Sequence, residues 1–414
     1  MEFNIVYFAF VGPKYGGVEQ KIIAQFDALL KQRANIVVYF VCSFSPNGIF
    51  AEEINKRTNV KVLVNRPSKV KNPFSRRKEK FQLISNVLKD YNPKNTIVYF
   101  RYPDPDFLFL NLLKVCKEYK FVTEHQEIEN TFKKSRFTGS YLGYVLETIY
   151  GRTVRKRICA FVGVTREISD FEVKRSCEPK KRKITIGNGI DVQKYPMRIM
   201  NNEHPEIIKI LFVGSGYRRH GLDRIIKGIA IHMNSEKKPY KINLRIAGDC
   251  LEMNENRKLV KKLKVGEYVE FLGEKNNSEL DEHFNWADIA AGNLGFHRVG
   301  LKYASNLKTK EYFSRGIPFF ESTTDEDFAD SKYVFKADSN ETPINMDEII
   351  SFALKSRSDS EHPKVMRNYA AVNLDWSIKM QKLILFLESL FKNPQAPPEF
   401  FDGAAKLHLA HNNL

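Results

Sequence analysis

Residues 286–322 contain side chains that suit a phosphorylated, hydroxyl-bearing ligand. A short apolar run at 289–291 is followed by a loop and then by a helical segment that ends at Gly316. In a parallel α/β sheet such a loop lies at the carboxyl end of a strand, where ligands bind. An ordinary solvated helix with a glycine stop would give the same pattern. The loop and the helix combine glycines, cations and one carboxylate: Asn293, Gly295, His297, Arg298, Gly300, Lys308, Lys310 and Glu311.

Two further groups lie at the ends of expected strands in the first half of the chain. His125 follows the run at 120–123 and has carboxylates beside it, which suits either chemistry or a structural role. Gly16 and Gly17 follow the run at 3–10 and open a helix, so a diphosphate or an acceptor can approach the backbone closely. The spacing is not GxGxxG, so it predicts no dinucleotide fingerprint.

The expected elements form two successive arrays of strands and helices. Buried strands are expected at 3–10, 36–43, 60–64, 96–100, 120–123, 159–164 and 184–186, and again at 209–213, 242–247, 268–272, 289–291, 317–321 and 333–336. This pattern predicts an α/β fold of two Rossmann-like domains that face each other across a cleft. The expected domains are 1–190 and 191–374, with a helix at 375–392 that crosses back to the first domain and a tail at 393–414.

The totals describe an ordinary globular chain. It has 414 residues, of which 43% are hydrophobic and 28% charged, and no apolar run long enough to span a bilayer. The segment that begins at Met1 is expected to be a strand and not a signal peptide. The five cysteines are scattered without a CxxC pair, which predicts reduced thiols in the cytosol and no structural zinc.

Nearly all of the net charge of +17 lies in the first half. Residues 1–190 hold 34 Lys and Arg against 18 Asp and Glu. Nucleic acid or an anionic membrane would suit this excess. The segment 136–157 mixes cations with apolar residues, as in a helix lying on a bilayer or in a helix of the domain core. The cations predicted to form a membrane or acceptor surface are Lys69, Lys71, Arg76, Arg77, Lys78, Arg155, Lys156 and Arg157.

Taken in order, several short motifs resemble the retaining glycosyltransferases of the GT-B fold, family 4 type, over nearly the whole chain. The region with His297, Arg298 and Lys308 resembles bacterial capsule or exopolysaccharide enzymes. The motifs are Gly16-Gly17-Val-Glu-Gln, His125, Asn188-Gly189-Ile190-Asp191, Phe212-Val213-Gly214, Ala247-Gly248-Asp249, Val269-x-Phe-Leu-Gly273, Ala287-Asp288-Ile289 and Lys308-x-x-Glu311-Tyr-x-x-x-Gly316-Ile-Pro318.

The resemblance implies that the second domain binds a nucleotide-sugar and that the first holds the acceptor. It implies that Glu311 accepts hydrogen bonds from the ribose hydroxyls. It also implies that His125 lies near the reacting sugar and orients it. Together with Gly16 and Gly17, the donor-binding residues are expected in the loops at Gly214 and at 295–300. They are Gly214, Ser215, Arg218, Arg219, His220, His297, Arg298, Lys308 and Glu311.

The chain departs from the family at three positions. Ser215 and His220 replace an arginine and a lysine that usually hold the diphosphate. We expect Arg218 or Arg219 to supply that charge with Lys308, while Arg298 and Lys302 are alternatives. Tyr303 replaces the carboxylate that usually reads the donor sugar.

The sequence therefore predicts a hexosyltransferase-type enzyme without a metal or other cofactor. It is expected to move a sugar from a UDP- or GDP-sugar to a lipid-linked or polymeric glycan. The expected location is the cytoplasmic membrane face, as a peripheral protein in surface polysaccharide synthesis, with no nucleic-acid partner. The alternatives are a nucleotide-sugar epimerase or sugar phosphorylase on the same fold, or a non-catalytic protein that uses its basic half to bind membrane or nucleic acid.

Overall fold

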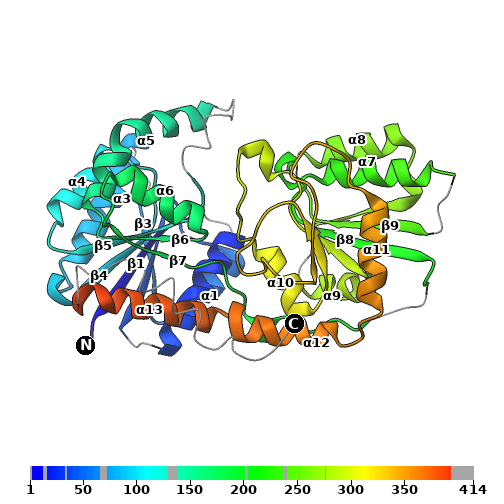
Figure 1. The fold of residues 1–414 in the computed structure, drawn as a ribbon. Helices are drawn as coiled ribbons and strands as arrows, with labels where there is room; N and C mark the ends of the chain where they lie inside the picture. Colours follow the sequence, from blue (N-terminus) through cyan, green and yellow to red (C-terminus); the bar gives the residue numbers. More distant parts are fainter. Residues whose placement is uncertain are drawn as a thin grey trace. The chain divides into compact units, whose positions relative to one another are not determined.

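The chain folds into two compact α/β units. The computed structural model describes residues 2–12, 16–32, 35–65, 72–128, 138–200, 204–236, 240–250, 252–275 and 277–392. One unit comprises Met1–Gly187 and the segment that begins at Trp376, and the other comprises Asn188–Asp375. Each has one parallel sheet with helices on both faces (Figure 1), which confirms the predicted α/β class with two Rossmann-like domains. The roles assigned to the two domains remain predictions.

The first sheet has seven parallel strands in the order β3-β2-β1-β4-β5-β6-β7. Most residues of β1, β2 and β4 are apolar because both faces of the sheet are covered. The strands are β1 (Asn4–Phe10), β2 (Ile36–Cys42), β3 (Val60–Val64), β4 (Thr96–Arg101), β5 (Lys120–His125), β6 (Ala160–Gly163) and β7 (Arg182–Thr185).

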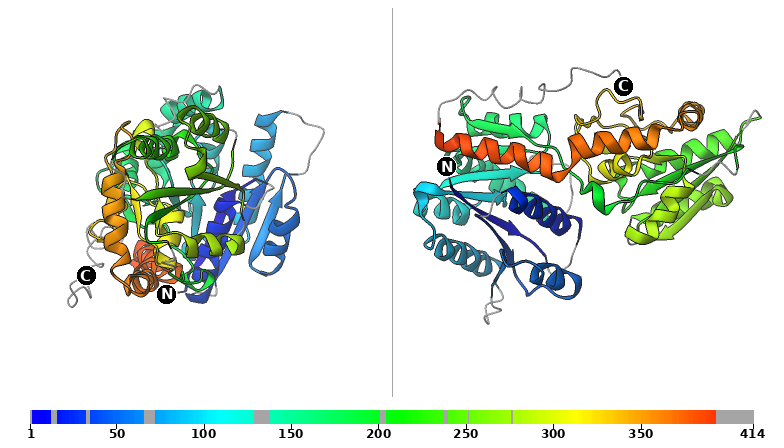
Figure 2. Two further views of the ribbon diagram at one scale, coloured as in Figure 1. Left: turned by 90° about the vertical axis from the view of Figure 1, so that its right-hand side faces the viewer. Right: turned by 90° about the horizontal axis from the view of Figure 1, so that it is seen from below.

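Helices cover both faces of this sheet. On one face lie α3 (Pro73–Leu88), α4 (Phe107–Val115) and α5 (Thr138–Arg157), which share a hydrophobic core with β1 and β4. On the other face α1 (Gly17–Gln32) packs beside α13 (Trp376–Lys392), as Figure 2 shows. The last long helix therefore belongs to the first unit, although the chain reaches it only after completing the second. The remaining helices of the unit are α2 (Gly48–Asn55) and α6 (Arg166–Ser176).

The second sheet has six parallel strands in the order β10-β9-β8-β11-β12-β13. One core lies between this sheet and α7, α8 and α11, and another lies between it and α9, α10 and α12. The strands are β8 (Ile207–Val213), β9 (Lys241–Ala247), β10 (Val269–Gly273), β11 (Ile289–Ala291), β12 (Phe319–Glu321) and β13 (Val334–Lys336). The helices are α7 (Leu222–Met233), α8 (Met253–Leu263), α9 (Asn277–Trp286), α10 (Leu307–Arg315), α11 (Met346–Arg357) and α12 (His362–Tyr369).

The stretch around α10 shows how local sequence sets these bounds. The helix ends at Gly316, whose φ of 75° lies in the left-handed region that glycine adopts at low cost. A Cβ at this position would also come within 2.5 Å of Cα of Pro363, so α12 packs closely there. The apolar residues of β12 follow directly and are buried between both helical layers. No helix within the described ranges is long and apolar enough to cross a membrane.

Candidate functional site

The loops that follow β8 and β11 meet at the carboxyl edge of the second sheet. These strands are neighbours, but the chain leaves them toward opposite sides of the sheet. Such a switch point is the usual ligand site of an open α/β sheet. The amide of Leu294 donates to the carbonyl of His220 at 3.0 Å, and a Cβ at Gly295 would lie 2.8 Å from the carbonyl oxygen of Arg218. The two loops are therefore in backbone contact, and that contact requires a glycine.

The β8 loop exposes its backbone because it is built from glycines. Gly214 and Gly216 have φ values of 149° and 71°, and a Cβ at Gly248 would lie 2.3 Å from the carbonyl oxygen of Gly214. The loop leads into a 3₁₀ turn, Arg218–His220, and then into α7, whose N-terminus favours anions. Both arginines of the turn are exposed, and neither guanidinium has a hydrogen-bond acceptor or a carboxylate partner in the described chain.

His220 adds an uncharged ring to this loop. The ring packs among Phe212, Tyr217 and Phe296, and its Nδ1 atom is buried without a partner in the described part of the chain. Burial, reinforced by Lys308 and Arg219, lowers the pKa of His220 to about 3. A neutral imidazole can donate or accept a hydrogen bond with a ligand. It does not supply the positive charge of the lysine that the resembled family usually has at this position.

Lys308 reaches the switch point from the first turn of α10. Its Nζ donates to the carbonyl of Gly292 at 3.2 Å and lies 4.6 Å from the ring centroid of Phe212. Burial lowers the pKa of Lys308 to about 7, while the nearby Glu321 acts in the opposite direction. A bound anion would favour the charged form of this amine, so anion binding and protonation are coupled here.

Glu321 is a buried carboxylate at the same edge of the sheet that the sequence reading missed. It accepts hydrogen bonds from Nζ of Lys336 and from the hydroxyl of Thr323, both at 3.1 Å. Burial raises the pKa of Glu321 to about 7, whereas Lys336 lowers it. The sequence does contain a signal for this residue. Glu321 is the only charged residue of β12 and is its last residue, at the carboxyl edge of the sheet.

Arg298 holds the β11 loop in place. Its five N–H groups bond to the carbonyl of Arg218, to both carboxylate oxygens of Asp223 and to both of Glu341, with N–O distances of 2.6–3.0 Å. Glu341 also binds Nε2 of His297 at 2.8 Å. A guanidinium has only five donors, so Arg298 has none left for a diphosphate. We therefore assign Arg298 a positioning role in place of the predicted ligand contact.

Comparisons with known proteins agree with this architecture. Residues 198–293 match the family described as "Glycosyl transferases group 1". A glycosyltransferase from Rickettsia africae superposes with a TM-score of 0.66 and 16% identity, over 94% of this chain and 99% of that one. HepE of Anabaena in complex with UDP gives a TM-score of 0.64 and 14% identity, over 94% and 100% of the two chains.

A third structure is WaaG, a glycosyltransferase involved in lipopolysaccharide biosynthesis. Its TM-score is 0.59 and its identity 16%, over 92% of this chain and 99% of that one. The fold is GT-B. A search of curated proteins gave no match. The family match and the GT-B neighbours together support the predicted glycosyltransferase.

Within the GT-B fold, Glu311 lies on α10 one turn beyond Lys308. Its Oε1 accepts from Nε of Arg315 at 2.8 Å, and Arg315 also binds Asp281 at 2.7 Å. Burial raises the pKa of Glu311, while Arg315 acts to lower it. The other carboxylate oxygen has no hydrogen-bond partner among the described residues, so it can accept from a ligand. The predicted role at the ribose stays a prediction.

The surroundings of His125 do not favour the predicted sugar contact. The side chain is completely buried, Nε2 lies 2.8 Å from the hydroxyl of Thr123, and Nδ1 lies 3.3 Å from Glu172. Its ring stacks on Tyr102 at 4.2 Å. Burial lowers the pKa of His125 to about 4, with Glu172 opposing this shift. Both ring nitrogens are engaged inside the first unit, so we interpret His125 as part of a buried network.

Arg155 belongs to the same network, so its assignment to a basic surface was wrong. Its guanidinium is 0% exposed and binds Glu172 at 2.6 Å and Glu147 at 2.7 Å. A helix turns by about 100° per residue, which places Arg155 inside while its neighbours Lys156 and Arg157 are exposed.

The other predicted residues of the first unit lie apart from this network. The amide of Gly16 donates to the carboxylate of Glu19 at 3.0 Å, and Gly17 begins α1. Arg76 and Lys78 are exposed on α3, whereas Arg77 is partly buried and forms an ion pair with Asp106. Lys69, Lys71 and the tail at 393–414 lie outside the described residues.

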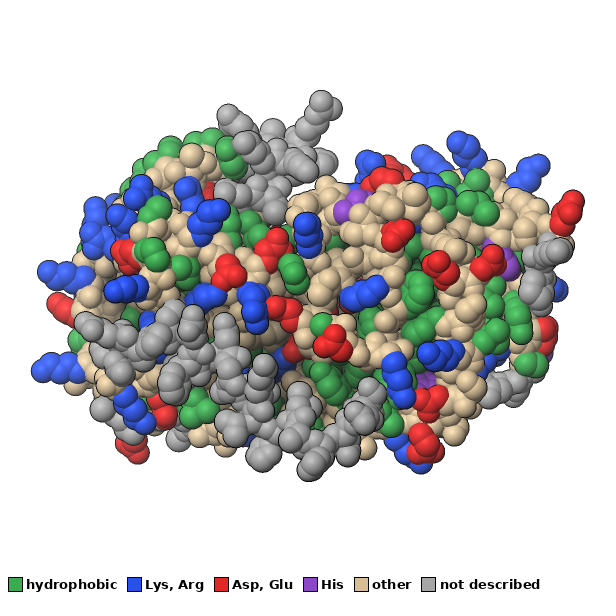
Figure 3. Space-filling view, viewed as in Figure 1, with side chains coloured by type: hydrophobic (Ala, Val, Ile, Leu, Met, Phe, Trp, Pro, Cys, Tyr) green, Lys and Arg blue, Asp and Glu red, His purple; other side chains and the backbone are tan. Residues whose placement is uncertain are grey.

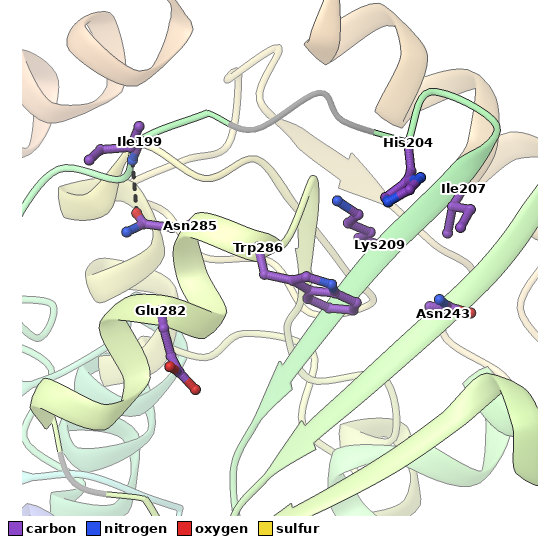
Figure 4. A pocket seen from close by; sticks show the side chains of 8 residues that line it. All are labelled: Ile199, His204, Ile207, Lys209, Asn243, Glu282, Asn285 and Trp286. Atoms are coloured by element: carbon purple, nitrogen blue, oxygen red, sulfur yellow. Dashed lines mark hydrogen bonds between the residues drawn. The ribbon is translucent and has the colours of Figure 1, made fainter.

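A separate hollow lies at the opposite edge of the second sheet. Its volume is about 640 Å³, and Ile207, Asn243 and Trp286 are among its lining residues (Figure 4). The amide of Ile199 donates to Asn285 at 2.8 Å beside it. It lies at the amino ends of β8 and β9, so it is not part of the switch-point site.

Proposed function

We propose that the protein is a retaining glycosyltransferase of the family 4 type that uses a UDP- or GDP-sugar. The observation that carries this proposal is the family match over 198–293, since that segment spans β8 to β11 and includes the β8 loop of the switch point. In the proposed complex, the backbone of Gly214 and the N-terminus of α7 face the diphosphate. Arg218, Arg219 and Lys308 supply positive charge, and Glu311 binds the ribose hydroxyls.

The proposed reaction breaks the bond between the anomeric carbon and the diphosphate and forms one to the acceptor oxygen on the same face of the sugar. The leaving diphosphate takes the proton of the acceptor hydroxyl. The described residues contribute by stabilising the charge that develops on the diphosphate, which costs little reorganisation because the cations are already in place. No protein base is needed in this scheme, which agrees with the buried and neutral state of His125.

We further propose that the enzyme works at the cytoplasmic membrane face, on a lipid-linked or polymeric glycan of surface polysaccharide synthesis. Leu142 and Ile149 are each 60% exposed and lie two turns apart on one face of α5. Figure 3 shows hydrophobic side chains on the surface over this helix. Lys156 continues that face and is also exposed. Exposed apolar side chains followed by cations suit an anionic bilayer surface, where each nearby cation contributes about 1 kcal/mol.

A donor screen tests the activity. We expect UDP or GDP to raise the melting temperature in a concentration-dependent way, because only the folded protein binds the ligand. The matching nucleotide-sugar should release its nucleotide only when an acceptor is present. Conversion of the nucleotide-sugar without an acceptor would instead identify an epimerase. If DNA or anionic vesicles stabilise the protein and no nucleoside diphosphate does, the proposal is wrong.

The pH dependence of nucleotide binding tests the role of Lys308. The pKa of this amine is about 7 without a ligand, and a bound diphosphate would raise it, so binding takes up a proton. We therefore expect the association constant for UDP or GDP to fall between pH 7 and 9, by up to about tenfold per unit. Over this range the diphosphate itself is already ionised.

The Lys308→Gln variant should bind the nucleotide weakly and with a flatter pH profile, measured by isothermal titration calorimetry. Glu321→Gln is the necessary companion, because Glu321 also titrates near pH 7. If the nucleotide affinity still falls with rising pH in Lys308→Gln and stops doing so in Glu321→Gln, the proton taken up on binding belongs to Glu321 and not to Lys308.

A further inference from the structure

A pocket of about 450 Å³ lies at the carboxyl edge of the first sheet. Phe10 ends β1 and Tyr102 follows β4, and both line this pocket. The chain leaves β1 and β4 toward opposite sides of the sheet, so this is the switch point of the first unit. The pocket therefore occupies in the first sheet the position that the β8 and β11 loops occupy in the second.

One face of α3 directs cations into this pocket. Pro73, Arg76, Arg77 and Lys80 all line it and are spaced three and four residues apart at the start of the helix. The amide of Phe74 is already capped by Asn72 at 3.0 Å and Pro73 has no N–H, so the cationic side chains are the groups that can bind an anion here.

Two of these cations have no counter-charge in the described chain. Arg77 is paired with Asp106, but neither Arg76 nor Lys80 has a carboxylate partner among the described residues. The Nζ atom of Lys80 lies 5.7 Å from the ring centroid of Phe10. Burial lowers the pKa of Lys80, and Arg77 and Arg76 lower it further. Asp104 also lines the pocket, so its lining carries three cations against one carboxylate, and an anion would balance the excess positive charge.

The walls of the pocket are aromatic and fixed. Phe10 packs against Phe81 of α3 at 5.6 Å between centroids. The hydroxyl of Tyr102 accepts from Nη1 of the buried Arg155 at 3.0 Å. The lining therefore combines two aromatic rings held in place by packing with several converging polar and charged groups, which suits a small polar ligand.

We propose that this pocket binds a phosphate group of the acceptor, with Arg76 and Lys80 as its phosphate-binding side chains and the attached group between Phe10 and Tyr102. The proposal rests on the proposed glycosyltransferase activity, since only a transferase needs an acceptor. The phosphate can belong to a soluble sugar phosphate or to a lipid-linked carrier. Both present the same anion to the same side chains.

Binding measured in the presence of saturating UDP or GDP tests the pocket, because the nucleotide then occupies the second unit. The soluble probe is glucose 1-phosphate, and the lipid probe is a phosphatidylcholine vesicle containing a polyprenyl phosphate. We expect Arg76→Gln and Lys80→Gln each to weaken binding of the productive probe about tenfold, the usual effect of losing one charge-assisted hydrogen bond. Lys89→Gln is the matched control, since Lys89 is exposed at the C-terminal end of the same helix and does not line the pocket.

Binding of glucose 1-phosphate identifies a soluble acceptor, and binding of the vesicle alone identifies a lipid-linked one. Either result supports the pocket if Lys89→Gln stays within about twofold of the wild type. The proposal is overturned if neither probe binds saturably, or if Lys89→Gln weakens binding as much as Arg76→Gln does. Nucleotide affinity is measured separately on each variant. If the wild-type protein does not bind UDP or GDP, the proposed function is wrong. If it binds the nucleotide but neither phosphate probe, only the proposal about the pocket is wrong. Arg76 is exposed, so Arg76→Gln should fold even if Lys80→Gln does not.

Discussion

The Glu311→Ala variant is expected to lose about 100-fold in affinity for the nucleotide and to lose the donor turnover that depends on it. In the proposed complex this carboxylate accepts two ribose hydroxyls, and each hydrogen bond to a charged group is worth about 1.5–3 kcal/mol. Arg315 should stay in place without Glu311, because it is still paired with Asp281 at 2.7 Å. Titration calorimetry with UDP or GDP measures the change directly.

Two variants make this result specific. Glu311→Gln keeps one oxygen acceptor, so we expect a loss of about tenfold, between the wild type and the alanine variant. Glu348→Ala removes an exposed carboxylate from the first turn of α11 and should leave the affinity unchanged. A dissociation constant for Glu311→Ala within threefold of the wild type, with the protein folded, would remove Glu311 from the site.

The second large effect is expected on stability. The Arg155→Met variant should lower the free energy of unfolding of the first unit by about 3–5 kcal/mol, because it removes the buried cation that binds Glu172 and leaves Glu147 with Arg175 at 3.4 Å. Urea denaturation followed by circular dichroism measures this loss. A decrease below about 1 kcal/mol would show that water or rearrangement replaces the lost cation.

A matched variant and a double variant separate charge from packing. Arg157→Met changes an exposed arginine two residues further along α5 and should cost less than about 0.5 kcal/mol. Arg155→Met combined with Glu172→Gln should be less destabilised than the sum of the two single variants, because the second change removes the charge of a carboxylate that has lost its arginine in the first.

The fold could be predicted because its signals are local. The strand of residues 4–10 is apolar on both faces, and the glycines at 214, 216 and 316 each stand where the backbone has a positive φ. Buried parallel strands and left-handed turns impose these residue types directly on neighbouring positions. Short apolar runs followed by glycine loops were therefore enough to predict two parallel sheets.

The partners of the predicted site residues could not be read in the same way. From its place at the end of a strand, His125 is expected to be accessible to a ligand. Arg155 of α5 and Glu172 of α6, which come later in the chain, instead enclose it in a buried cluster. Arg298 looked available for a phosphate, but Asp223 and Glu341 occupy its donors. A sequence shows that a cation is present, whereas the carboxylates that neutralise it are fixed only by tertiary packing.

Tyr102 lines the pocket of the first unit, and it also stacks on His125 and accepts from Arg155. A substitution that reshaped this wall for a different acceptor would at the same time disturb a fully buried ion cluster. A substitution at Arg76 would not disturb that cluster, because Arg76 lies at the solvent-exposed start of α3. Among related enzymes, changes of acceptor preference should therefore accumulate on α3 while the tyrosine wall stays constant.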